Sequence, residues 1–276
     1  MKPMTMEEFA LYAHFNFASD AHFLHSLPFN PDNVSPVDVS RETFSPAESL
    51  SPEPSVSRET LERLQALIDL LTKWQKTVNL VGLSTLTDPW RRHILDSAQL
   101  LPYLKLETLS SNSSLDRSPP QPPGKPPGKP LGPIADLGSG AGFPGLVLSI
   151  LGVENIILIE SDARKAAFIR EATRIVNSSA RVLNQRIETV TETFPLIVAR
   201  ALAPLDKLLI LAKPLLSSPG VCLFPKGADA DKELTTASER WRFSKVESFA
   251  SITDPKGRIL RLIQPQVKHV PGKTCP

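Results

Sequence analysis

The sequence has little cysteine and no long apolar run. Its 276 residues include two cysteines, Cys222 and Cys275, which are too few for a disulfide framework and lack metal-site spacing. No stretch approaches the roughly 18 apolar residues of a membrane-spanning helix. Glu7 and Glu8 lie where a signal peptide would have its apolar segment. We therefore expect a cytoplasmic protein with no membrane partner and no bound metal.

Net charge is also small, at +2, but it is unevenly distributed. Residues 1–55 contain two of the 31 basic side chains and eight of the 29 acidic ones. This segment therefore has a net charge of −6, and 56–276 has one of +8. A basic body is compatible with a polyanionic partner such as nucleic acid, although the excess is modest.

Composition divides the chain into five segments. The first is irregular in pattern and contains the pentapeptide Val-Ser-Arg-Glu-Thr, which recurs at 56–60. Its first 29 residues are expected to form a short, weakly docked helix or to be disordered, and we expect removal of 1–55 to leave activity intact. Proline fills 8 of the 16 positions at 118–133, which favours an extended spacer. The predicted boundaries are an irregular, disordered leader at 1–56, a helical cap at 57–106, a linker insert at 107–133, an α/β domain at 134–265 and a tail at 266–276.

Two helices are expected in the cap. Apolar residues recur at spacings of three and four over 61–78, which indicates one buried helix face, and Ser57 precedes it as a capping residue. The second helix is expected to begin with Asp88 as its cap and Pro89 at its first position, and to run to about Leu101.

A glycine-rich loop follows the apolar stretch that begins at Ile134. Gly138, Gly140 and Gly142 alternate there, and glycine both adopts positive φ and lets a ligand approach the backbone. Asp136 precedes them, and an acid at that point suits a ligand with a positive centre, such as S-adenosylmethionine. From Gly140 the loop also matches the dinucleotide pattern GxGxxG, so a dinucleotide site and a turn without any ligand remain alternatives.

Strands and helices alternate from residue 134 onward, which predicts an α/β protein with a doubly wound, mostly parallel sheet. The closing hairpin, 243–251 and 258–264, would insert an antiparallel strand into it. That Rossmann-like arrangement is typical of S-adenosylmethionine-dependent methyltransferases. Strands are expected at 134–138, 155–160, 181–184, 195–200 and 219–224, with helices near 144–151, 163–176, 205–213 and 229–240.

Polar side chains at the ends of the predicted strands are candidates for ligand contacts, because ligands of open α/β sheets lie beyond the carboxyl ends of the strands. Glu160 would accept both hydroxyls of a ribose, or it would cap the next helix. Ile187 and Glu188 follow the third strand, where an adenine edge would lie; Glu188 is otherwise a surface acid. Arg200 ends an apolar strand, so it either enters a polar cleft or pairs with an acid.

The second cap helix and a later strand add further candidates. His93 and Asp96 are three residues apart and share a helix face, so they could form an acid/base pair. Orienting the cap against the α/β domain is the favoured role, because no nucleophilic side chain accompanies them. Arg92 and Lys226 could contact a phosphate or a base, or they could be solvated.

Taken together, these motifs resemble the bacterial RsmG (GidB) family of 16S rRNA methyltransferases. The Arg-His-Ile-Leu-Asp-Ser run and the Gly-Phe-Pro-Gly loop are the most specific features. The matching segments are 73–80, 92–97, 136–145, 199–201 and 225–227.

The resemblance implies transfer of the methyl group of S-adenosylmethionine to N7 of a guanine (position 527) in 16S rRNA. The partner would be the 30S subunit or an assembly intermediate, and the protein a monomer. Cofactor contacts would fall on Gly138, Phe143, the pair Ile187 and Glu188, and Arg200. Arg200 is also the candidate catalytic residue, and Arg92, His93 and Lys226 are candidates for RNA contact. Glu160 stands where many members have Asp.

The expected chemistry needs no catalytic base, because guanine N7 carries a free lone pair at neutral pH. In-line displacement would then depend on proximity and alignment. Two alternatives remain: a methyltransferase of small molecules or proteins, and a binding module without turnover.

Overall fold

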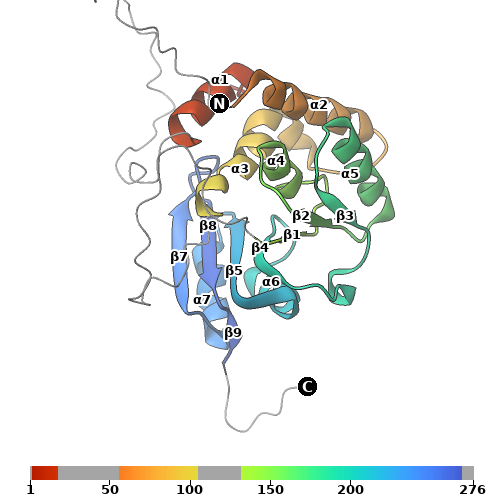
Figure 1. Ribbon diagram of the computed structural model, residues 1–276. Coiled ribbons are helices and arrows are strands. Elements are labelled where there is room, and N and C mark those ends of the chain that lie inside the picture. The colour runs from red at the N-terminus through yellow and green to blue at the C-terminus, as the bar shows by residue number, and fades with distance from the viewer. Residues whose placement is uncertain (1, 18–55, 105–131, 269–276) are drawn as a thin grey trace, which may run out of the picture.

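The computed structural model describes residues 2–17, 56–104 and 132–268. At its centre is a seven-stranded sheet in the order β3-β2-β1-β4-β5-β8-β7 (Figure 1). The first five strands in chain order pair in parallel, whereas β8 is antiparallel to both β5 and β7. The predicted fold class is therefore confirmed. The strands are β1 (Ile134–Leu137), β2 (Ile156–Ile159), β3 (Arg181–Leu183), β4 (Phe194–Val198), β5 (Leu216–Lys226), β7 (Lys245–Ala250) and β8 (Arg258–Ile263).

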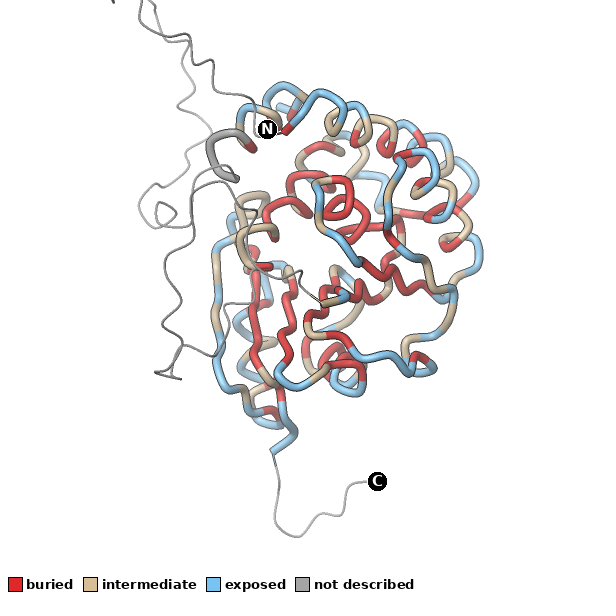
Figure 2. The backbone as a smooth tube through the Cα atoms, viewed as in Figure 1, coloured by how far each residue is buried: buried red, intermediate tan, exposed pale blue. Residues whose placement is uncertain are grey.

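Helices cover both faces of the sheet, and Figure 2 shows the buried strands between them. On one face α2, α4 and α5 pack over side chains such as Ile134 and Leu196. On the other, α6 and α7 pack over their neighbours Ala135 and Ile197. Both faces are buried, so β2 and β4 read as continuous apolar runs. The helices are α2 (Arg58–Trp74), α4 (Gly145–Ile150), α5 (Ala163–Ile175), α6 (Leu205–Ala212) and α7 (Ala230–Arg240).

The cap differs from the prediction in its second helix. Ser57 caps α2 as expected, because its side chain accepts a hydrogen bond from the Thr60 N–H. The second segment, however, is a π-helical turn over Trp90–Leu95 that continues into a short α3 (Asp96–Ala98). A π-helical turn inserts an extra residue per turn and is often found at functional sites.

Of the two expectations for the start of the leader, disorder is wrong for residues 6–17 and a short docked helix is observed. These residues form helix α1 (Met6–Phe17), which lies beside the cap helices in Figure 1. The side chains of Phe9 and Ala13 are fully buried, and the Phe9 ring lies 5.4 Å from that of Trp90. Phe9 and Ala13 therefore belong to the hydrophobic core. The remaining leader residues, 18–55, lie outside the described part of the chain.

The end of the α/β domain also differs from the predicted one. Strand β9 (Gln266–Val267) pairs with β6 (Trp241–Arg242), so the α/β domain extends beyond the predicted end at residue 265. Most of the predicted linker and of the tail falls at 105–131 and 269–276, outside the described residues. Within the described residues, no helix is both long and apolar enough to cross a membrane.

Candidate functional site

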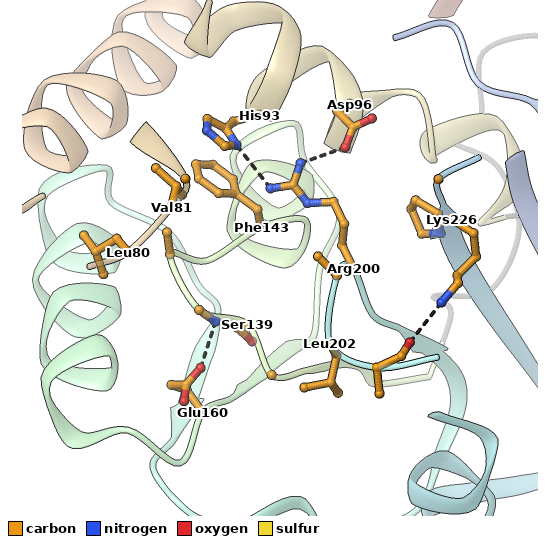
Figure 3. A pocket seen from close by; sticks show the side chains of 18 of the residues that line it. Leu80, Val81, His93, Asp96, Ser139, Phe143, Glu160, Arg200, Leu202 and Lys226 are labelled. Carbon is orange, nitrogen blue, oxygen red and sulfur yellow. Dashed lines mark hydrogen bonds and ion pairs between the residues drawn. The ribbon is translucent and has the colours of Figure 1, made fainter. Parts of the chain in front are cut away.

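A cavity of about 840 Å³ lies between the cap and the carboxyl edge of the sheet (Figure 3). Residues from the glycine loop, from the ends of β2, β4 and β5 and from the cap line it. Two of the candidate residues, Asp136 and Gly142, are not among its lining residues. The other candidates are brought together there: Arg92, His93, Gly138, Gly140, Phe143, Glu160, Ile187, Glu188, Arg200 and Lys226.

The glycine loop has the left-handed backbone that only glycine adopts at low cost. Gly138, Gly140 and Gly142 have φ angles of 65°, 58° and 84°. A Cβ on Gly138 would lie 2.6 Å from Cδ1 of Leu202, which also lines the cavity. The predicted need for glycine thus has two causes at Gly138, the backbone conformation and the space that the Leu202 side chain fills.

Asp136 lies beneath this loop and supports it. It is fully buried, and its Oδ2 accepts a hydrogen bond from the Gly145 N–H at 2.9 Å. Its Oδ1 is buried without a partner among the described residues. Burial raises the pKa of this carboxyl to about 7. Asp136 therefore does not line the cavity itself and supports the loop and the start of α4.

Glu160 fixes the loop from the neighbouring strand. Its Oε2 accepts from the Gly140 N–H at 2.9 Å, and its Oε1 accepts from the Asp162 N–H at 2.8 Å. The cap of α5 is Asp162, whose carboxylate accepts from two backbone N–H groups of the first turn. The alternative reading of Glu160 as that cap is therefore wrong. Each carboxylate oxygen has a second lone pair, so Glu160 can still accept hydrogen bonds from a ligand.

Arg200 joins the α/β domain to the cap. Its Nη1 donates to Asp96 Oδ2 at 2.7 Å and to the Arg92 carbonyl at 2.9 Å, and its Nη2 lies 3.2 Å from His93 Nδ1 (Figure 3). The guanidinium also lies over the Phe143 ring, 5.3 Å from its centroid. Both readings of Arg200 therefore hold, because it forms an ion pair with an acid and also lines the cavity.

His93 is held as a neutral imidazole with a defined tautomer. Arg200 can only donate, so His93 Nδ1 accepts, and the proton is on Nε2, which lies 2.8 Å from Thr85 Oγ1. The Thr85 hydroxyl in turn donates to the Gly82 carbonyl. The imidazole stacks on Phe143 at 4.7 Å between centroids and 8° between planes. Burial, assisted by neighbouring arginines, lowers the pKa of His93 to about 3.

Asp96 contacts Arg200 rather than His93, so the two do not form an acid/base pair in this structure. The favoured prediction, that this segment orients the cap, agrees with the contacts. Lys226 is not solvated, since its Nζ lies 2.7 Å from Glu233 Oε2 and donates to the Ala203 carbonyl at 2.9 Å.

Sequence reasoning predicted the turn of the closing hairpin but did not place it at the site, where Ser251, Thr253 and Asp254 line the cavity. It also missed the cap loop that contributes Leu80 and Val81. A signal was present in the first case, because these polar residues lie at the turn between the two strands of the predicted hairpin. In the second case the loop residues are apolar and read as the end of a helix.

The titrations of His93 and Asp136 are expected to oppose each other in the pH dependence of stability. The pKa of His93 falls on folding from 6.5 to about 3. The unfolded chain therefore binds more protons in that range, and His93 makes stability increase with pH. The pKa of Asp136 rises from 3.8 to about 7, so Asp136 makes stability decrease with pH. Each slope is at most about 1.4 kcal/mol per pH unit.

Urea unfolding between about pH 4.5 and 6.5 would measure this balance. His93→Gln should make the slope of unfolding free energy against pH more negative, and Asp136→Asn should make it more positive. Asp69→Asn, on the exposed face of α2, serves as the control. If both His93→Gln and Asp136→Asn show the wild-type slope, neither group titrates differently in the folded chain and in the unfolded chain.

Comparisons with known proteins agree with the motifs. A family model described as rRNA small subunit methyltransferase G (GidB) matches residues 60–116 and 127–259. Proteins named ribosomal RNA small subunit methyltransferase G from Paramagnetospirillum magneticum and Rhodospirillum rubrum are 44% and 46% identical over 216 and 217 residues. These alignments cover 78% of this chain and 94% and 96% of the relatives. The namesake from Rhodospirillum centenum is 49% identical, over 75% of this chain and 85% of its own. The chain therefore belongs to the rRNA small subunit methyltransferase G (GidB) family.

Proposed function

We propose that this protein transfers the methyl group of S-adenosylmethionine to N7 of a guanine in 16S rRNA. The observation that carries the proposal is the glycine loop, which in a chain of this family opens onto a cavity at the carboxyl edge of the sheet. A pure nucleotide-binding module is disfavoured, because members of this family are named methyltransferases.

The residues around the loop fit S-adenosylmethionine. Gly138 and Gly140 present backbone without side chains to the cavity, and Glu160 offers carboxylate lone pairs to ribose hydroxyls. Ile187 and Glu188 would contact the adenine, as an apolar surface and as an acceptor for its amino group. When bound, the cofactor supplies an electrophilic methyl group on a sulfonium centre.

This chain's residues can align the reactants without removing a proton. The basic lone pair of His93, on Nδ1, accepts from Arg200, and its Nε2–H donates to Thr85, so the imidazole does not offer a base to the cavity. Arg200 and Phe143 form a rigid wall, because the guanidinium is held by Asp96 and the ring by the stacked imidazole. Such a preorganised wall lowers the entropic cost of bringing N7 in line with the methyl group.

Cationic side chains at the cavity support an RNA partner. Among the described residues, Arg92, Lys165, Arg186 and Lys207 line the cavity and have no ion-pair partner. They are free to hold phosphates, which contribute most of the affinity for nucleic acid. His93 is a weaker candidate for RNA contact than the sequence predicts, because it is buried. Lys226 is also a weaker candidate for RNA contact, because its ammonium group forms an ion pair with Glu233.

We infer that the protein acts as a cytoplasmic monomer on the 30S subunit or an assembly intermediate.

The test is methyl transfer from labelled S-adenosylmethionine to 30S particles that lack native N7-methylguanine. The modified base is mapped by strand cleavage, and naked 16S rRNA is assayed in parallel. Label at N7 of a single 16S guanine is the expected result. Cofactor binding without label on either RNA would overturn the substrate and favour a small-molecule or protein acceptor.

Replacing Gly138 by valine is expected to abolish cofactor binding, measured by calorimetry. A side chain there requires a strained positive φ and displaces Leu202, which lines the cavity. Gly152→Val is the matched control, because Gly152 also has positive φ, at 95°, but a Cβ there meets no atom within 4 Å. Full affinity in Gly138→Val would show that the loop does not hold the cofactor.

A further inference from the structure

The glycine loop, which follows β1, borders one half of the cavity. The second half lies further along the strand order, beyond β5. Residue Lys226, at the end of β5, pairs with Arg258, at the start of β8. The turn between β7 and β8 therefore lies at the carboxyl edge, beyond β5, whereas Glu160 and Ile187 follow β2 and β3 on the other side of β1. Ser251, Thr253 and Asp254 bring this turn into the lining of the cavity.

The cap holds this turn in place. The Gln99 side chain accepts from the Ile252 N–H at 3.0 Å, and the Thr253 hydroxyl donates to Asp96 Oδ1. Because Asp96 also pairs with Arg200, the turn, the cap and the end of β4 form one hydrogen-bonded unit. A side chain on this turn is therefore positioned relative to the rest of the cavity before any substrate binds.

Asp254 is the acid in this half with unused acceptor capacity. Of the other acids on this side, Glu233 is engaged by Lys226 and by the Leu205 N–H, and Asp96 by Arg200 and Thr253. Asp254 Oδ1 accepts from the Lys256 N–H at 3.0 Å, while its Oδ2 has no hydrogen-bond or ion-pair partner among the described residues. A carboxylate that lines a cavity and has one oxygen without a partner is an acceptor for a ligand that donates.

We propose that Asp254 recognises the target guanine by its Watson–Crick edge. This inference rests on the proposed function. The N1–H and N2 amino groups of guanine both donate, and a carboxylate accepts both; adenine has a lone pair at N1 and is repelled. Enzymes that modify a base commonly read it at this edge after it leaves the stack. N7 is on the opposite edge of the purine, so Asp254 would turn N7 toward the glycine-loop half.

The same contact strengthens during the reaction. As the bond from N7 to the methyl group forms, the purine becomes cationic and its N1–H and amino groups become stronger donors. A carboxylate therefore binds the transition state more tightly than the ground state, which accelerates the chemical step. Loss of Asp254 should accordingly lower kcat as well as raise KM.

The test compares 30S particles reconstituted with guanine or with inosine at the methylated position, since inosine lacks only the N2 amino group. Wild-type enzyme should prefer guanine in kcat/KM by roughly 10- to 100-fold, the range for a hydrogen bond to a charged group. Asp254→Ala should lose most of this preference and react more slowly with guanine. Asp254→Asn, which retains an oxygen for the Lys256 N–H, should behave similarly if the turn itself is intact.

Two further measurements distinguish a failure of this inference from a failure of the proposed function. Calorimetric cofactor affinity should be unchanged in both Asp254 variants, and Asp231→Ala, at an exposed position in α7 that does not line the cavity, should match wild type throughout. A wild-type preference that survives in both Asp254 variants would overturn the inference and leave the proposed function standing. No guanine methylation by the wild-type enzyme would instead overturn the proposed function.

Discussion

Replacing Arg200 by methionine is expected to lower the free energy of unfolding by about 3 kcal/mol and to abolish methyl transfer. The Arg200 and Asp96 side chains are only 16% and 19% exposed, so the change leaves a largely desolvated carboxylate without its charged partner. The guanidinium also holds the imidazole of His93 and covers Phe143. Its loss therefore releases the cavity wall together with the contact between cap and sheet.

Urea unfolding and single-turnover methylation would measure the two effects separately. The matched control is Arg181→Met, which breaks the ion pair to Glu192 between half-exposed side chains and should cost at most about 1 kcal/mol. Adding Asp96→Asn to Arg200→Met should restore part of the stability but not the activity. Wild-type stability in Arg200→Met would mean that Asp96 finds water or another donor, and that the cap is held by other contacts.

Phe9→Ala is expected to destabilise the protein by about 4 kcal/mol, the usual cost of removing a fully buried phenylalanine. Phe9 contacts Trp90 in the π-helical turn that precedes Asp96. The Met4 N–H also donates to Asp88 Oδ1 at the start of this segment. Removal of residues 2–17 should therefore reduce activity at growth temperature, contrary to the expectation from the sequence.

Leu11→Ala on the same helix is the control, because Leu11 is 58% exposed and its truncation should change stability by less than about 0.5 kcal/mol. Thermal unfolding of the full chain compares the two variants. Equal melting temperatures would mean that α1 leaves its contact with the cap at little cost. In that case the original expectation for the leader would hold.

The sheet could be predicted from the sequence because its signal is local. Apolar runs at β1 and β2 are bounded by polar or glycine residues, and the observed strand ends lie within a residue or two of the predicted ones. Helix α1 gave no such signal, because Leu11 is exposed on a helix whose buried Phe9 is only two residues away. Its weak apolar periodicity did not distinguish a docked helix from an irregular segment.

Most of the candidate residues could be placed at one edge of the sheet from the sequence, but their contacts could not. The sequence can place an acid at the end of a strand, but the direction of its side chain depends on nearby N–H groups. Asp136 turns under the loop to Gly145, whereas Glu160 reaches the loop from the side and lines the cavity. The ion pair between Arg200 and Asp96 joins residues 104 positions apart, and no local pattern specifies it.

The reversal of β8 also constrains when the site can form during synthesis. Chains emerge from the ribosome N-terminus first, and domains generally fold as units. Here β8 returns its first residue, Arg258, to the edge where β5 ends, and the turn that precedes it completes one wall of the cavity. A nascent chain that has released the cap, the glycine loop and β4 therefore still lacks this wall. The enzyme becomes competent only after β8 has left the ribosome as well.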